Sequence, residues 1–332
     1  MCGIARAKLR FAEKLIRQRA QTMETTTVPR CILLGMVCCV LLLGGSSSAI
    51  YLGGPSSSLH LPADLAAIVT DIDNWLTNTT ATTSAPPPPP PPPRPAALVR
   101  LVYHDCIGRC NGCINGSDIN NIGLLSTART LTELYNLSFS SATINGQPLS
   151  MADFWTLVAM RALYVTTIPS QNSETPAAEE EGTVYPPLDF LMGRVDCPGG
   201  WDNDDHEGTI PLGVYNWTQV HEVFGPQGFN FTVQEIVAIL GAHSIGTASP
   251  LNAGFQGQWD LTPGYLDNSY YSTLADASNL YVSVPVNSSI FMELYQWNAT
   301  IDHPVNPANQ RMMMNSDVSL LFNFPSNPKG QV

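Results

Sequence analysis

The spacing of apolar residues predicts a mostly helical protein. Apolar positions recur at intervals of three and four in residues 62–76, 96–106, 122–136, 151–165 and 232–246, a spacing that gives a helix one apolar face. The alternation typical of strands is scarce. Residues 166–230 are rich in Pro, Gly, Asn and acidic side chains, which favours long loops over sheet. We therefore expect one helical domain with long connecting loops.

A different pattern marks the N-terminus. Residues 1–30 carry seven Lys and Arg against two Glu, and a run of roughly 14 mostly aliphatic residues follows from Cys31 to Gly44. Ala49 ends a stretch of small residues that suits cleavage. Residues 31–53 are therefore predicted to be a signal peptide or a signal anchor, that is, a membrane tether, and either places the remaining chain outside the cytosol. A buried core helix is the alternative, but it should show polar residues at helical spacing.

Residues 54–325 form the predicted domain, and residues 326–332 are a tail. Residues 77–95 interrupt the domain after its first helix. Pro86 to Pro93 is an unbroken proline run, which cannot donate backbone hydrogen bonds and favours an extended polyproline II spacer. We interpret this segment as a surface insertion.

Secretion is also indicated by glycosylation sequons and cysteines. Asn-x-Ser/Thr sequons begin at Asn78, Asn115, Asn136, Asn216, Asn230, Asn287 and Asn298. Four of the eight cysteines lie in or before the targeting segment. The other four suggest two disulfides with three possible connectivities in an oxidising compartment, and they are Cys106, Cys110, Cys113 and Cys197.

Length and charge narrow the classes of function. The chain has 332 residues with 44% hydrophobic content, which is enough for a domain with a buried cofactor pocket. Removing the basic first 30 residues from the totals leaves eight Lys and Arg against 25 Asp and Glu. An acidic body repels phosphate backbones, so we expect no nucleic-acid partner. We expect a monomer.

Arg100 and His104 are the first candidates for chemistry. They are four residues apart in a helical pattern, so both side chains project from one face, with Tyr103 beside them. A neutral His can move a proton between the oxygens of a bound peroxide, and a permanent Arg charge can stabilise the developing negative charge. On its own, such a pair is more often structural.

His243 is the second candidate. It ends a strongly apolar helical stretch and has small neighbours, including Gly241, Ala242 and Ser244, which let a flat macrocycle approach. An iron-ligating His needs an acceptor for its second ring nitrogen, and Asp317 lies in an otherwise apolar stretch. A hydrogen-bonded core His is the simpler interpretation of this residue alone.

Together these motifs resemble the plant, fungal and bacterial haem peroxidase superfamily, over roughly residues 60–325. The resemblance rests on Arg-Leu-Val-Tyr-His-Asp at 100–105, Asn-Ile-Gly-Leu at 121–124 and Gly-Ala-His-Ser-Ile-Gly at 241–246. It implies haem b held between a distal and a proximal helix, hydrogen peroxide as substrate and a small electron donor. In this family His243 would be the axial iron ligand, Asp317 its partner, and Asn121 the acceptor that keeps His104 basic.

Two features resemble different subclasses. Trp259 and the pair Met312 and Met313 resemble the cytochrome c and ascorbate peroxidase class, in which a Trp lies beneath the haem, and we hypothesise that Trp259 is oxidised and relays electrons. Ascorbate peroxidases carry an Arg where this chain has Asn252. Because ascorbate is an anion and the body is acidic, small phenolic or aromatic donors are favoured instead.

A calcium site is implied by resemblance to the secreted fungal peroxidases. Its oxygen ligands would be Ser244, Asp260, Thr262 and Asp267, since hard oxygen donors suit Ca²⁺. The alternative is that these side chains cap a turn. Asp105 matches one ligand of a second, distal calcium site, whose remaining motif is degraded here.

Two other classes of function stay open. His104, Cys106, Cys110 and Cys113 have spacings close to those of zinc ligands, which would need reduced thiols. A surface glycoprotein that kept the peroxidase fold without turnover is the other alternative. The complete set of candidate catalytic residues argues against it.

Overall fold

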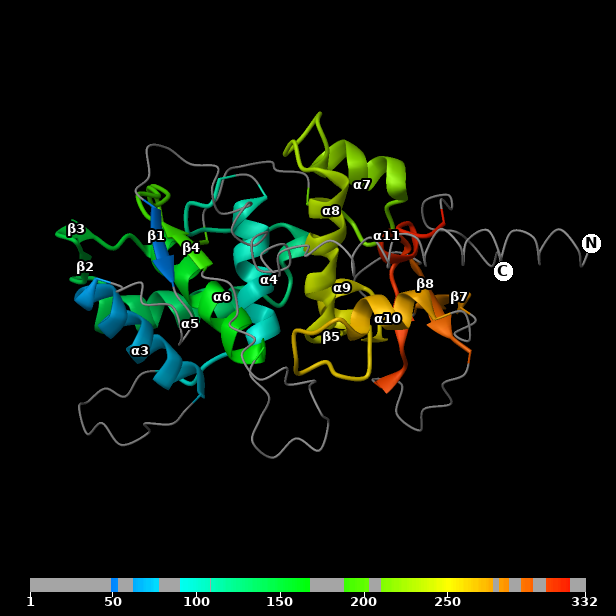
Figure 1. The fold of residues 1–332 in the computed structure, drawn as a ribbon, viewed down its shortest axis with the longest axis horizontal. Helices are drawn as coiled ribbons and strands as arrows, with labels where there is room; N and C mark the ends of the chain where they lie inside the picture. The colour runs from blue at the N-terminus through cyan, green and yellow to red at the C-terminus, as the bar shows by residue number, and fades with distance from the viewer. Residues whose placement is uncertain are drawn as a thin grey trace, which may run out of the picture.

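Two groups of helices make up the described part of the chain (Figure 1). The computed structural model describes residues 49–52, 62–77, 90–107, 109–167, 188–202, 210–276, 281–286, 294–300 and 309–322, with the backbone alone at 49–52, 188 and 189. The N-terminal group contains α3 (Ala63–Thr77), α4 (Pro95–Cys106), α5 (Leu125–Leu134) and α6 (Met151–Thr167). The C-terminal group contains α7 (Trp217–Phe224), α8 (Val233–Leu240), α9 (Pro250–Ala253), α10 (Ser269–Ala275) and α11 (Asn315–Val318). The predicted mostly helical fold is confirmed.

The sequence pattern located the long helices well and their ends less well. The segment expected at 122–136 is preceded by a 3-10 turn, η1 (Ile119–Asn121). Its helix α5 begins only at Leu125 and passes at Tyr135 into a π-helical turn, η2 (Tyr135–Phe139). The segment expected at 232–246 ends α8 at Leu240 and continues as a 3-10 turn, η3 (Gly241–Ser244). The last turn of a helix often changes to 3-10 or π-helical hydrogen bonding, because its last carbonyls lack the partners that an α-helix provides.

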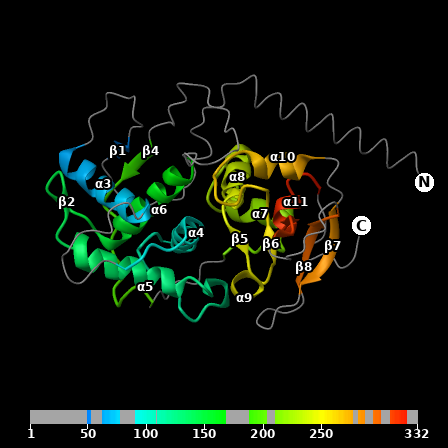
Figure 2. The same cartoon turned by 90° about the horizontal axis from the view of Figure 1, so that it is seen from below.

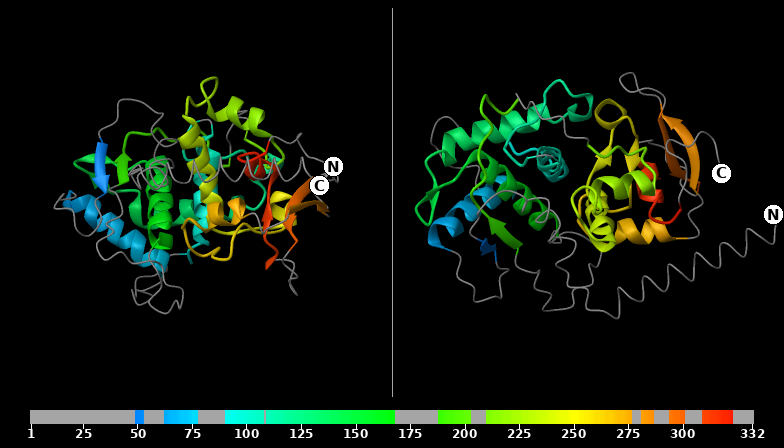
Figure 3. Two further views of the ribbon diagram at one scale, coloured as in Figure 1. Left: turned by 45° about the vertical axis from the view of Figure 1, so that its right-hand side comes forward. Right: turned by 90° about the horizontal axis from the view of Figure 1, so that it is seen from above.

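Helix α4 lies on the side of the N-terminal group that faces the C-terminal group (Figure 2). It packs against α6, which is buried along almost its whole length, and buries Leu98, Leu101 and Val102. Each such side chain contributes about 1.5–3 kcal/mol when removed from water. In Figures 2 and 3, α4 and α8 are the helices of the two groups that face each other.

The two groups meet beside α4. Gly246, at φ +95°, follows η3, and a Cβ on it would lie 2.7 Å from Cβ of Ala96. Gly123 similarly leaves room for the side chain of Asn252, whose Cγ would lie 2.7 Å from an added Cβ. Only glycine permits both this backbone conformation and this approach. The start of α4 and the turn before α5 are thus packed closely against the segment that follows His243.

Small sheets, which the sequence pattern did not predict, complete the described fold. Three two-stranded antiparallel pairs join β1 (Ala49–Leu52) to β4 (Leu188–Leu191), β2 (Thr143–Ile144) to β3 (Gln147–Pro148), and β5 (Thr247–Ala248) to β6 (Gly257–Gln258). A three-stranded sheet has the order β7 (Tyr281–Val286), β8 (Leu294–Ala299) and β9 (Met312–Met313). Val does recur at every second position in Tyr281 to Val286, as in a strand. The segment is short and contains Pro285, so this alternation predicts a strand only weakly.

The N-terminal segments fall partly outside the described residues. In strand β1, Ala49 pairs with Leu191, so a chain cut after Ala49 would keep Ile50 to Leu52 beside β4. Residues 1–48 lie outside the described residues, as do residues 78–89 of the proline-rich insertion. Trp75 Nε1 donates to the carbonyl of Pro90 at 2.7 Å, so this insertion returns to the helix from which it leaves. In the parts of the chain that can be described, no helix is long and apolar enough to cross a membrane.

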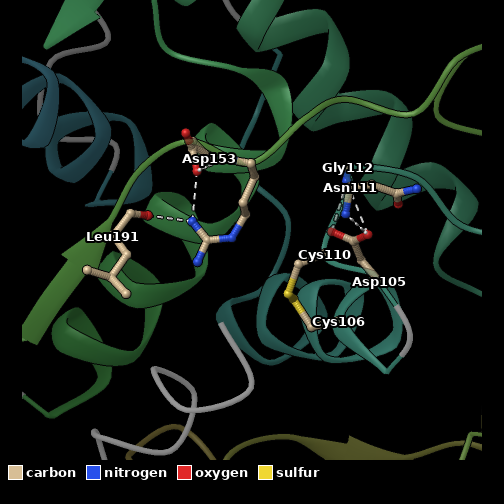
Figure 4. The surroundings of a disulfide bond; sticks show 8 residues. Asp105, Cys106, Cys110, Asn111, Gly112, Asp153 and Leu191 are labelled. Atoms are coloured by element: carbon tan, nitrogen blue, oxygen red, sulfur yellow. Dashed lines mark hydrogen bonds and ion pairs between the residues drawn. A yellow bond between two sulfur atoms is a disulfide. The ribbon is translucent and has the colours of Figure 1, made fainter. Parts of the chain in front are cut away.

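Two disulfides join the four cysteines of the body, as predicted, and the fold selects the connectivity. Cys106 at the end of α4 pairs with Cys110, and Cys113 pairs with Cys197, 84 residues further along the chain. Figure 4 shows the first bridge beside the carboxylate of Asp105. Together the bridges fix the loop after α4 to itself and to the segment after β4.

Candidate functional site

His104 lies on α4 with the orientation of its ring set by Asn121. Nδ1 of His104 is 2.8 Å from Oδ1 of Asn121, and Nδ2 of Asn121 donates to the carbonyl of Asn115 at 2.9 Å. Because the amide nitrogen is already committed, the amide oxygen faces the ring and accepts from Nδ1–H. Nε2 of His104 is therefore the nitrogen with a lone pair, as a general base requires.

The surroundings of His104 keep it neutral. The side chain of His104 is half-buried, and the loss of solvation lowers the pKa of His104 to about 3. The positive charge of Arg100 adds to this lowering, while the hydrogen bond to Asn121 opposes it. At neutral pH the imidazole is therefore a proton acceptor.

Arg100 lies one turn before His104 on the same helix. Its guanidinium donates to the carbonyls of Asn120 at 2.8 Å, Ile122 at 3.3 Å and Asn252 at 3.3 Å. Burial lowers the pKa of Arg100 to about 10, so it stays charged at neutral pH. The backbone of η1 and α9 thus holds a permanent cation beside the base, as the spacing predicted.

Tyr103 lies beside His104 with the two rings edge to face, 5.7 Å between centroids. Burial raises the pKa of Tyr103 above its usual range, so its hydroxyl keeps its proton. The phenol is therefore a hydrogen-bond donor next to the base, a position in which an aromatic side chain was expected.

His243 lies in η3, directly after α8. The start of α8 is fixed by a capping box, in which Thr232 accepts from the backbone N–H of Glu235 at 3.3 Å and Glu235 accepts from that of Thr232 at 2.7 Å. Nδ1 of His243 lies 2.8 Å from Oδ1 of Asp317, which is fully buried at 0% exposure. The expected His–Asp pair is thus present, and Nε2 of His243 is left for a ligand.

Asp317 collects further donors. Trp259 Nε1 donates to its Oδ2 at 2.8 Å, the backbone N–H of Met314 donates to the same oxygen at 2.7 Å, and the hydroxyl of Tyr270 donates to Oδ1 at 2.9 Å. The indole of Trp259 stacks on the His243 ring, with 4.4 Å between centroids and 18° between planes. These hydrogen bonds offset the high free-energy cost of burying the Asp317 carboxylate.

Tyr270 is the residue that sequence reasoning missed. It is fully buried in α10, and burial first and the charge of Asp317 second raise its pKa well above the usual range. Its only signal was position, three residues after Asp267 in a stretch already singled out for metal ligands. Nothing along the chain connects it to Asp317, 47 residues away.

The four residues expected to bind calcium are brought together. Ser244 Oγ lies 2.9 Å from Oδ2 of Asp260 and 3.4 Å from Oδ1 of Asp267, and Thr262 Oγ1 lies 2.9 Å from Oδ2 of Asp267. The carbonyl of Tyr265 also lies 3.2 Å from Ser244 Oγ. Burial, and to a smaller extent the charge of Asp267, raise the pKa of Asp260. Two carboxylates with hydroxyl and carbonyl oxygens form a donor set that suits a hard cation.

Asp105 has a different environment. Its Oδ1 accepts from the backbone N–H of Asn111 at 2.9 Å, and both its oxygens lie 3.1 Å from the backbone nitrogen of Gly112, as Figure 4 shows. These bonds close the loop that the Cys106–Cys110 disulfide also closes. The carboxylate therefore has a structural task that needs no ion, which favours a loop-fixing role over a distal calcium ligand.

The described cysteines do not support zinc binding. All four are in disulfides, and a disulfide sulfur is not the thiolate that binds zinc. Within the described ranges, no three His, Cys, Asp or Glu side chains form the kind of cluster that a structural zinc site uses.

The residues on α4 and η3 fit a haem. Each element presents one histidine whose Nδ1 is engaged by a fixed acceptor, so that Nε2 of His243 would be left to hold iron and Nε2 of His104 would be left to exchange a proton with peroxide. The side chain of His243 is 31% exposed, so a bound group could reach it.

Comparison with known proteins agrees with this geometry. A family model described as Peroxidase matches residues 71–326, and the chain belongs to this family, within the haem peroxidase superfamily. It is 27% identical over 240 residues to a protein of Yarrowia lipolytica named as a heme-binding peroxidase, covering 68% of this chain and 66% of that protein.

Other relatives match over shorter segments. A mitochondrial cytochrome c peroxidase of Yarrowia lipolytica is 38% identical over 91 residues, which is 27% of this chain and 26% of the relative. A peroxisomal L-ascorbate peroxidase of Oryza sativa is 30% identical over 124 residues, 35% of this chain and 40% of the relative. The chain thus spans less than two thirds of the length of these curated relatives.

Proposed function

We propose that this protein is a haem peroxidase that reduces hydrogen peroxide and oxidises small donors by one electron at a time. The observation that carries this proposal is the pair of oriented histidines, His104 fixed by Asn121 on α4 and His243 fixed by Asp317 in η3. The bound haem would supply the redox chemistry, storing two oxidising equivalents and releasing them singly. His243, through Nε2, would hold the iron.

His104 and the residues around it would move the proton of hydrogen peroxide. Nε2 of the neutral His104 would accept a proton from one oxygen of hydrogen peroxide and return it to the other oxygen, which departs as water. The Arg100 cation stabilises the negative charge that develops as the bond between the oxygens breaks. Asn121 preserves the required tautomer, and the hydroxyl of Tyr103 can donate a hydrogen bond in the same space.

The test is spectroscopic. Purified full-length protein reconstituted with haem is expected to show a Soret band that changes on addition of one equivalent of peroxide and recovers when a donor is added. A protein that binds haem but leaves its spectrum unchanged with peroxide would support the alternative, a glycoprotein that kept the fold without turnover. A protein that contains zinc and shows no Soret band would favour the other alternative, zinc binding by His104 and the nearby cysteines.

We also propose small phenolic or aromatic molecules as donors. At residue 252, where ascorbate peroxidases carry Arg, the chain has Asn, and the carbonyl of Asn252 accepts from Arg100. The net charge of the chain is −12, which further disfavours an anionic donor. Steady-state rates with guaiacol and ascorbate at matched concentrations test this choice, and a higher kcat/KM for ascorbate would reject it.

Calcium is the proposed second cofactor. Ser244, Asp260, Thr262 and Asp267, with the carbonyl of Tyr265, supply the oxygens, and an ion would neutralise two facing carboxylates that burial otherwise penalises. Because Ser244 follows His243, this ion would tie the axial ligand to the loop before α10. Elemental analysis after dialysis against a chelator and readdition of calcium measures its stoichiometry.

We further propose that the protein is monomeric and secreted, or tethered to the outer face of a membrane by residues 31–53. Two disulfides support an oxidising compartment. Among the sequons, Asn136 and Asn230 have exposed side chains suited to glycosylation, whereas Asn115 is half-buried. A mobility shift after glycosidase treatment, with N-terminal sequencing of the secreted protein, tests both features.

A further inference from the structure

The hydrogen bond between Tyr270 and Asp317 has a consequence for where oxidising equivalents reside. We propose that Tyr270 is a redox residue: it gives one electron to the centre that peroxide has oxidised and becomes a neutral tyrosyl radical, while Asp317 takes its phenolic proton. This inference deepens the proposed peroxidase function and rests on it.

The proton acceptor is the first observation. The hydroxyl of Tyr270 donates to Oδ1 of Asp317 at 2.9 Å, and both side chains are fully buried. A phenol that loses an electron becomes strongly acidic, and in a dry interior it must pass its proton to a base, because an unpaired buried charge is costly. Asp317 is a base already in hydrogen-bond contact.

The route for the electron is the second observation. The ring of Tyr270 lies edge to face with the ring of His243, 6.3 Å between centroids, and His243 in turn stacks on Trp259 at 4.4 Å. Tyr270 therefore contacts the proposed axial ligand through ring atoms and through the shared Asp317 oxygen. His243 thus has an aromatic ring on each of two sides, Trp259 stacked and Tyr270 edge to face.

Tyr271 provides the contrast. Its ring lies 5.0 Å from that of Tyr270, at 76°, but its hydroxyl donates to the backbone carbonyl of Val237 at 3.0 Å. A carbonyl oxygen is a hydrogen-bond acceptor but too weak a base to take the proton. Two adjacent tyrosines thus differ in this one respect, so oxidation is expected to stop at Tyr270.

The step is balanced. One electron leaves the phenol and reduces the oxidised centre by one of its two equivalents, while the O–H bond breaks and its proton moves to Oδ1 of Asp317. An external one-electron donor later returns the electron, and Asp317 returns the proton. The residue thereby holds one equivalent inside the protein until a donor arrives.

The experiment is electron paramagnetic resonance of the haem-loaded full chain, frozen shortly after one equivalent of peroxide. The wild type is expected to give a tyrosyl signal that narrows when the protein contains ring-deuterated tyrosine. Tyr270→Phe is expected to lose this signal, and the matched variant Tyr271→Phe is expected to keep it. Optical spectra recorded in parallel report whether peroxide has oxidised the haem.

Several outcomes overturn the inference. They are a signal that ring-deuterated tyrosine leaves unchanged, as an indole or porphyrin radical would, and a tyrosyl signal that survives Tyr270→Phe or disappears in Tyr271→Phe. If Tyr270→Phe does not bind haem, the wild-type signal must show coupling to an exchangeable proton that D₂O replaces, because the proton stays on Asp317. An optical spectrum that does not respond to peroxide rejects the peroxidase function itself and is thus distinguishable from failure of this inference.

Discussion

The indole of Trp259 lies stacked on the imidazole of His243, 4.4 Å away, and both rings donate to the same carboxylate, that of Asp317. The proposed axial ligand is therefore held by one buried acid and one aromatic face. Along the chain, His243 and Trp259 precede the three-stranded sheet and Asp317 follows it. This arrangement places an oxidisable ring directly beside the proposed iron ligand.

Replacing His104 by Leu should slow the reaction with peroxide by about 10²–10⁴-fold, the usual contribution of a positioned general base. Haem binding should persist, because His243 and Asp317 are untouched. Stopped-flow measurement of the Soret change gives the rate constant. An unchanged rate would contradict the assignment of the base.

The pH dependence of the same rate constant follows from the state of His104. The base works when neutral, and burial together with Arg100 lowers its pKa to about 3. The rate constant should therefore stay level from pH 8 down to about pH 4 and fall as the pH approaches 3. In Arg100→Leu the charge that helps to lower the pKa is gone, so the fall should begin at a higher pH. A downward shift would contradict this electrostatic account.

Asp317→Asn should weaken the proximal site. An amide cannot accept from His243, Trp259, Tyr270 and the backbone of Met314 at once, and each buried donor left without a partner costs about 1–3 kcal/mol. We expect a lower free energy of unfolding and a lower iron–imidazole stretching frequency in resonance Raman spectra.

Trp259→Phe is the control for this variant. It keeps the bond between His243 and Asp317, so the iron–imidazole frequency should stay near that of the wild type. Equal frequencies in Asp317→Asn and the wild type would show that the carboxylate does not polarise the ligand.

Chelation of calcium should lower the melting temperature. An ion present at about 100 times its dissociation constant stabilises the folded state by about 2.7 kcal/mol. Asp267→Ala should remove the effect of added calcium, whereas Asp71→Asn, at an exposed position on α3, should keep it. Calorimetry with and without a chelator provides the comparison, and identical curves for the wild type would exclude a stabilising ion.

The two disulfides should differ in their effect on stability. A bridge across 84 residues restricts the unfolded chain by about 4.5 kcal/mol and one across four residues by about 2 kcal/mol, in the chain-entropy description. The paired variant Cys113→Ala and Cys197→Ala should therefore unfold at lower urea than the paired variant Cys106→Ala and Cys110→Ala. The reverse order would indicate that the short bridge acts mainly by fixing Asp105.

The sequence by itself determined the long helices and the residues that each presents. Arg100 and His104 share one face because side chains on a helix recur on the same face every three to four residues. The apolar helix before His243 and the small residues around it are likewise visible in the sequence alone. The order of motifs also indicated the family. Local periodicity carries this information, since it depends only on neighbours along the chain.

Only the tertiary structure decided which distant residues meet. It paired the cysteines, placed Arg100 against the carbonyl of Asn252, formed the sheet of β7, β8 and β9, and brought Tyr270 to Asp317. Such contacts follow from how apolar faces pack and from which buried polar groups find partners, which no spacing along the chain encodes. A tyrosine therefore became part of the proximal site without any sequence motif to mark it.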